Sequence, residues 1–143
     1  MNTATILKSK GNGVVTATAN TSLLDIANLL AQHRIGCIVI VDDDDQVRGI
    51  VSEHDFIRAI GQAGPKVLKE PVSDFMTTAV VTARNTDTYD RLMSEMTIQR
   101  FRYLPVVEMG RLVGIVSIGD LVKMHVADAE FESAAMRQHI TSA

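Results

Sequence analysis

The 143-residue sequence is poor in several residue types, and each shortage excludes a class of protein. It contains no Trp, two Tyr and four Phe, so it lacks the stacking surfaces typical of single-stranded nucleic-acid binders. Cys37 is its single cysteine, which excludes an internal disulfide and favours a reducing, cytoplasmic location. No apolar run has the length of a signal sequence or a membrane span. The 14 basic and 17 acidic residues form no basic block, so we expect neither nucleic acid nor membrane as a partner.

Patterns typical of catalysis are also missing. The four histidines are scattered without metal-ligand spacing, and the aspartates at 42–45 lack the alternating ligands of a calcium loop. Neither glycine-rich phosphate-loop pattern occurs. Cys37 lies in an apolar run, which predicts a buried, unreactive thiol. The sequence therefore predicts no metal site, no obligatory cofactor and no enzyme.

One pattern of residues occurs twice in this chain, which is 46% hydrophobic and 22% charged. Residues 14–44 align with 80–110, and 46–58 with 111–123, giving eleven identities in 44 positions. Five identities fall in one window, GIVSEHD at 49–55 and GIVSIGD at 114–120. This duplication predicts two equivalent units that pack face to face, because each unit alone buries too little apolar surface to be stable.

The apolar spacing predicts the same elements in each unit. Residues 23–30 and 89–96 repeat at i, i+3, i+4 and i+7, which is typical of helices. Ser22 with Asp25 is expected to cap the first helix, and Asp87 or Thr86 the second. Paired strands are predicted at 37–41 and 47–51, and again at 104–107 and 112–116.

Further elements complete a β-α-β-β-α order in each half. Short strands are predicted at 14–17 and 80–83, and a second helix follows each strand pair, at 56–60 and from residue 121 onward. The prolines and glycines of residues 61–74 predict a linker. We expect a mixed α/β (α+β) fold divided into residues 1–64 and 65–143, with a C-terminal helix.

These residues resemble the cystathionine-beta-synthase-type domain, or CBS domain, whose tandem pairs are called Bateman modules. The resemblance is carried by RIGCIVIVD (34–42) before GIVSEHD and by RFRYLPVVE (100–108) before GIVSIGD. It implies a stand-alone regulatory or sensory module of pseudo-two-fold symmetry. Its expected ligand is an adenine nucleotide such as AMP, ATP or NAD, and its output acts on a separate, unnamed protein through a change of shape.

The repeated window suits such a ligand chemically. If a strand ends near residue 51 and a helix begins near 55, Ser52 and Asp55 lie where backbone N–H groups are unpaired. An ionised Asp accepts two hydrogen bonds, which matches the two hydroxyls of a ribose. By resemblance this is the role of Asp55 and Asp120, with Ser52 and Ser117 as donors to phosphate or ribose. The same residues are also ordinary N-caps, but their occurrence in both repeats favours binding in at least one.

The family resemblance assigns the remaining site residues to two clefts. Aliphatic walls for the base are expected from Ile50, Ile115, Ile38 and Leu104. The Asp55 cleft is expected to include Phe75, Met76 and Thr77, with His54 and Arg58 as possible cations. The Asp120 cleft is expected to include Lys10, Gly11, Arg102 and Tyr103. We therefore expect the Asp120 cleft to bind the more highly charged nucleotide.

The tail at 121–140 places apolar residues at steps of four and three, which is typical of a helix with one apolar seam. This helix either folds back on its own sheet or pairs with a second copy, and the resemblance favours a homodimer. An alternative function is a dimerisation scaffold whose nucleotide clefts are vestigial.

Overall fold

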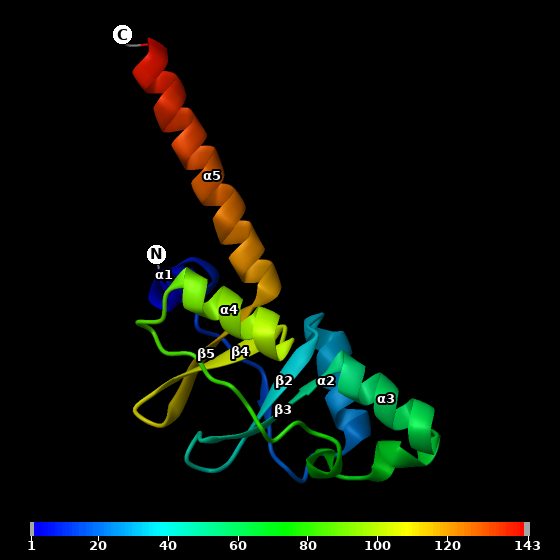
Figure 1. The fold of residues 1–143 in the computed structure, drawn as a ribbon. Helices are drawn as coiled ribbons and strands as arrows, with labels where there is room; N and C mark the ends of the chain where they lie inside the picture. The colour runs from blue at the N-terminus through cyan, green and yellow to red at the C-terminus, as the bar shows by residue number, and fades with distance from the viewer. Residues whose placement is uncertain (1, 142–143) are drawn as a thin grey trace.

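The computed structural model describes residues 2–141, with side chains described as far as residue 138. Its first half contains α1 (Thr3–Lys10), β1 (Thr16–Ala17), α2 (Leu23–His33), β2 (Cys37–Val41), β3 (Val47–Ser52) and α3 (Glu53–Ala63). The turns η1 (Pro65–Lys69) and η2 (Val72–Asp74) lead to α4 (Tyr89–Gln99), β4 (Tyr103–Glu108), β5 (Arg111–Ser117) and α5 (Ile118–Thr141). Figure 1 shows the two hairpins side by side, α2 and α3 over one of them, and α5 extending away from the body.

The predicted hairpins are confirmed in both halves. β2 pairs antiparallel with β3, with Ile38 opposite Val51, and β4 pairs antiparallel with β5, with Leu104 opposite Val116. β1 adds a short parallel strand to the first hairpin. The predicted strand at 80–83 is wrong, because only Ala83 makes backbone hydrogen bonds with β4 and it forms an isolated bridge with Val106.

Helix caps follow the sequence in part. Ser22 caps α2 as predicted, with its Oγ accepting from the Asp25 N–H at 3.1 Å. The cap of α4 is Thr88, and not Asp87 or Thr86. Asp87 does not cap because its carboxylate accepts from the Arg84 N–H and pairs with Arg91. The following helix of the first half, α3, ends at Ala63 with Gly64 as its C-cap, in the region of Gly61 and Gly64 where the sequence predicts its end.

The helix α1 was not predicted, and it packs on the distant half of the chain. Its buried Ile6 and Leu7 join the core of the second half, together with Leu104 and Leu121. The linker does the reverse, since Val67 and Val72 belong to the core of the first half. Each half is therefore completed by the segment that precedes the other half, and we call α1 and residues 65–77 the entering segments.

A glycine on each hairpin admits the entering segment. A Cβ on Gly49 would lie 2.6 Å from Met76 Sδ and 3.1 Å from the Thr77 carbonyl oxygen. A Cβ on Gly114 would lie 2.8 Å from both δ-carbons of Leu7. These are the first residues of the repeated windows, so the duplicated glycine is explained by close packing.

We predict that Gly49→Ala destabilises the protein by about 1–3 kcal/mol, because the added methyl overpacks against Met76 and the backbone of Thr77. Gly61→Ala is the control, since it lies inside α3 with nothing within 4 Å of its Cβ. This control is expected to stabilise by about 0.5–1 kcal/mol, because alanine favours helix. Urea unfolding measures both free energies, and equal effects of the two substitutions would contradict the packing argument.

Candidate functional site

The repeated Ser-x-x-Asp residues form the same turn in both halves. At the start of α3 the Ser52 N–H donates to Asp55 Oδ2 at 2.9 Å, and the Asp55 N–H donates to Ser52 Oγ at 3.3 Å. At the start of α5 the Ser117 N–H donates to Asp120 Oδ2 at 2.8 Å, and the Asp120 N–H donates to Ser117 Oγ at 3.1 Å. This is the reciprocal bonding of a capping box, and it fixes each carboxylate at the foot of a helix.

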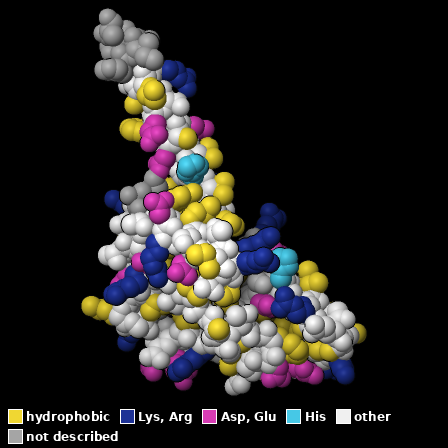
Figure 2. Space-filling view, in the orientation of Figure 1, with side chains coloured by type: hydrophobic (Ala, Val, Ile, Leu, Met, Phe, Trp, Pro, Cys, Tyr) yellow, Lys and Arg dark blue, Asp and Glu magenta, His cyan; other side chains and the backbone are white. Residues whose placement is uncertain are grey.

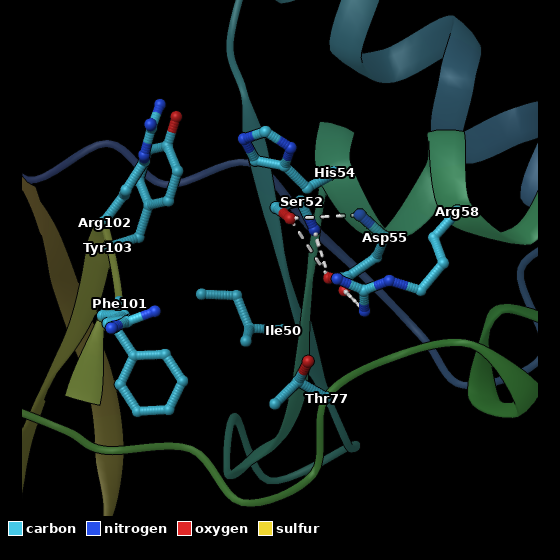
Figure 3. A pocket seen from close by; sticks show the side chains of 10 residues that line it. Ile50, Ser52, His54, Asp55, Arg58, Thr77, Phe101, Arg102 and Tyr103 are labelled. Carbon is cyan, nitrogen blue, oxygen red and sulfur yellow. Dashed lines mark hydrogen bonds and ion pairs between the residues drawn. The ribbon is translucent and has the colours of Figure 1, made fainter.

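A pocket of about 340 Å³ lies at the foot of α3 between the two halves. The first half supplies Ile50, Ser52, His54, Asp55 and Arg58, and the linker supplies Thr77. Across the pocket lie Phe101, Arg102 and Tyr103 (Figure 3), and Arg100 completes the lining. Its volume is near the lower end of the ~300–1,000 Å³ range of small-molecule sites. We call it the Asp55 pocket.

A second pocket of about 300 Å³ is formed by the equivalent elements, with the two halves of the chain exchanged. Its foot comes from β5, with Ile115 and Ser117, and its opposite wall comes from the start of β2, with Gly36 and Cys37. Its remaining lining residues are Lys10, Gly13, Val14, Val15, Ile35 and Tyr103. Asp120 is bonded to Lys10 and Ser117 and does not itself line the cavity. We call this the Lys10 pocket.

The assignment of Arg102 to the Asp120 side is wrong. Arg102 lines the Asp55 pocket, and Tyr103 lines both pockets. Each pocket pairs the helix foot of one half with the start of the hairpin in the other half, whereas the prediction kept Arg102 beside the foot of its own half. Arg100 and Phe101 were not predicted as site residues, although they directly precede Arg102 in the sequence.

Several other predicted residues lie outside the pocket linings. Ile38 and Leu104 were expected as walls for a base, but both are fully buried in the two cores. Met76 packs against Gly49 instead of lining a pocket, and Phe75 packs on the core of the first half. Gly11 caps the end of α1, while Gly13 lines the Lys10 pocket in its place.

Basic side chains gather at the Asp55 pocket, whereas the predicted charge preference was based on basic side chains at the Asp120 cleft. Arg58, Arg100, Arg102 and His54 line it. Figure 2 shows basic side chains beside a histidine on the side of the body between the foot of α5 and α3. In the Lys10 pocket the single lysine in the lining is already bonded to Asp120 at 2.6 Å.

The two carboxylates differ in what covers them. Asp55 Oδ1 faces Arg58 Nη1 at 3.7 Å, beyond hydrogen-bond distance, and the Arg58 side chain is mostly exposed. Asp120 accepts a hydrogen bond from Lys10 Nζ at 2.6 Å. Partial burial alone would raise the pKa of Asp120, but the bonds from Lys10 and Ser117 outweigh it and hold that pKa below its usual value.

Tyr103 lines both pockets, and its hydroxyl group lies so close to Gly36 that a Cβ added there would require the Tyr103 side chain to shift. Burial raises the pKa of the Tyr103 hydroxyl, and the charge of nearby Glu53 acts in the same direction. In the described part of the chain no cluster of three or more His, Cys, Asp or Glu is placed to hold a metal ion. No helix within the described residues has both the length and the apolar character needed to cross a membrane.

Comparison with known proteins identifies this architecture. The CBS domain family model matches residues 11–62 and 72–126, so the chain belongs to the CBS domain family, with two tandem copies. The mitochondrial CBS domain-containing protein CBSX3 of Arabidopsis thaliana is 29% identical over 94% of this chain and 69% of its own length. A CBS-domain containing protein from Agrobacterium tumefaciens has a crystal structure 42% identical to this chain, covering 87% of it and 99% of the other, with a TM-score of 0.84.

Several similar structures were solved with adenosyl compounds. The CBS domain pair of protein MJ0100, in complex with 5′-methylthioadenosine and S-adenosyl-L-methionine, is 26% identical over 90% of this chain and 98% of its own, with a TM-score of 0.80. A CBS domain protein from Pyrobaculum aerophilum complexed with AMP is 27% identical over 84% of this chain and 89% of its own, with a TM-score of 0.75.

Cys37 lies in the wall of the Lys10 pocket, where its reactivity can be measured. Burial raises the pKa of its thiol strongly, and the negative charge of Asp55 adds to this effect. We predict that the native protein reacts with iodoacetamide at pH 9 at least 100-fold more slowly than the urea-unfolded protein, because only the thiolate is nucleophilic. Mass spectrometry of timed samples measures both rates, and equal rates would contradict the placement of Cys37.

Proposed function

We propose that this chain is a regulatory CBS pair that binds an adenine nucleotide, such as AMP, ATP or NAD, in the Asp55 pocket. The observation that carries the proposal is the composition of that pocket, where one carboxylate held by a helix capping box shares the lining with arginines contributed by both halves. The structures solved with AMP and with S-adenosyl-L-methionine support an adenosyl ligand. We infer a regulatory role and not an enzymatic one.

The groups of the Asp55 pocket match the parts of a nucleotide. Asp55 Oδ1 takes no hydrogen bond among the described contacts, so it is placed to accept from ribose hydroxyls. Arg58, Arg100 and Arg102 provide forked donors suited to phosphate oxygens. Ile50 and the rings of Phe101 and Tyr103 supply apolar and aromatic surface for the base.

The proposed output is a change in the relative position of the two halves. A ligand that contacts both Asp55 and Arg102 draws together parts of the chain that belong to different halves. The carbonyl of Arg102 also accepts from the Ile118 N–H at 2.9 Å, at the first residue of α5. Movement of Arg102 toward a phosphate would therefore be passed to the helix that projects from the body. A separate effector protein would read this change.

We further propose a homodimer formed through α5, in which residues 1–64 and 65–143 of each chain act as the two halves of one Bateman module. After Leu121, α5 leaves the body and exposes Val122, Val126 and Met136 at 52%, 49% and 66%. These residues share one helical face with Ala129 and Ser133, as the predicted seam requires. Ile140 of that seam lies outside the residues with described side chains.

The nucleotide proposal predicts that Arg102→Ala weakens AMP binding about tenfold or more, because a charge-assisted hydrogen bond to phosphate is lost. Adenosine, which has no phosphate, should bind the variant within about twofold of the wild-type affinity. Arg111→Ala, at an exposed position on β5 that lines neither pocket described here, is the matched control. Isothermal titration measures the affinities of the wild type and both variants for each ligand. Equal losses of AMP and adenosine affinity in Arg102→Ala would contradict the assignment of Arg102 to the phosphate.

The dimer proposal predicts that Val126→Glu shifts the protein toward monomer, because a charge is then buried without a partner. Phe131→Glu is the control, since Phe131 is 75% exposed on the opposite face of α5. Sedimentation velocity of the wild type and both variants at equal protein concentrations distinguishes monomer from dimer. A monomeric wild-type protein, or dissociation by the control alone, would remove the seam from this role.

A further inference from the structure

The two entering segments meet their hairpins differently. In the first half Thr77 forms an isolated antiparallel bridge with Ile50 through two backbone hydrogen bonds, of 2.8 and 2.9 Å. In the second half the entering segment is the helix α1, whose first N–H groups, those of Thr3 and Ala4, donate to the Asp87 and Asn85 carbonyls and not to the hairpin. The Ile115 carbonyl, equivalent to that of Ile50, instead accepts from Lys10 Nζ at 2.9 Å.

Lys10 therefore has two acceptors at the foot of α5. Its ammonium group donates to the Ile115 carbonyl and to Asp120 Oδ2, the latter at 2.6 Å. The side chains of Lys10 and Asp120 are 30% and 20% exposed, so the pair is partly shielded from water. The corresponding contact at Asp55 is the 3.7 Å approach of Arg58, whose side chain is 65% exposed.

The helix that carries Lys10 is fixed to the second half at several points. The Thr3 N–H and hydroxyl both donate to the Asp87 carbonyl, at 2.9 and 3.0 Å. Ile6 and Leu7 are buried in the core, and Leu7 fills the space above Gly114. Lys10 is the last residue of this anchored helix, so it is held near Asp120 at a high effective concentration.

We propose that Lys10 is a built-in occupant of the Asp120 site, which holds the carboxylate that a ribose would need and so restricts each chain to one nucleotide, bound at Asp55. This inference rests on the proposed function for the Asp55 pocket. It assigns the identical Ser-x-x-Asp turns to different tasks: Asp55 receives a ligand, and Asp120 anchors α1. The Lys10 pocket then does not bind adenosyl ligands while Lys10 is present.

A rival role for Lys10 is that of a phosphate ligand, and the two roles predict opposite effects of its removal. As an occupant, Lys10 competes with the nucleoside, so Lys10→Met should create a second site. As a phosphate ligand it would attract the nucleotide, so the same substitution should weaken or abolish binding. Lys8→Met is the matched control, because Lys8 is exposed on the same helix and removes the same charge.

The test is equilibrium dialysis with adenosine and with AMP, together with native mass spectrometry to count bound molecules. We expect one adenosine per chain for the wild type and for Lys8→Met, and two for Lys10→Met. Asp120→Asn added to Lys10→Met should return the count to one. With AMP, Lys10→Met should not reduce the affinity of the first site by more than about twofold, since Lys10 lies outside the Asp55 pocket.

The outcomes separate this inference from the proposed function. Two sites in the wild type, or no additional site in Lys10→Met, would overturn the inference. No site in the wild type but one in Lys10→Met would overturn the assignment of the Asp55 pocket and support the role of Lys10. No binding to either protein would overturn both.

Discussion

The exchange of entering segments is the constraint on which the rest of the structure depends. Each hairpin is covered by chain that leads into the other half, and the contact is close enough to require glycine at positions 49 and 114. Because Leu7 and Met76 fill those spaces, neither half can complete its core without the other. The pockets are a consequence of this exchange, since each is lined by residues of both halves.

Periodicity in the sequence was sufficient to predict most of this fold. The strand at Cys37–Val41 and the helix at Leu23–His33 carry strong apolar patterns, and the structure has them where the pattern places them. The helix α1 was missed because its two buried apolar residues, Ile6 and Leu7, are adjacent and give no apolar repeat. Its helical state depends on packing against a distant half, although Asn2, which accepts from the Thr5 N–H, is a capping signal that the sequence did contain.

The candidate site was harder to predict than the fold, for a geometric reason. The internal alignment shows that Arg102 corresponds to Gly36, but it does not show which helix foot each residue faces. Proximity in sequence suggested Asp120, whereas the arrangement of the halves places Arg102 opposite Asp55. Ile38 and Leu104 were misassigned for a different reason. Both lie in apolar strands, and all five residues of β2 are buried, so the apolar pattern does not distinguish a core residue from a pocket wall.

Duplication explains the shared turn but not the difference between the two sites. The Ser-x-x-Asp bonding matches to within a few tenths of an ångström in the two halves, so it serves the helix start whether or not a ligand is bound. What differs is supplied from outside the turn, by Arg102 against Gly36 and by Thr77 against Lys10. In the proposed function, specificity is therefore carried by residues at the start of the opposite hairpin and in the entering segment, which take no part in the hydrogen bonds of the cap. Such an arrangement allows the two sites of one module to diverge in charge while the fold that holds them is unchanged.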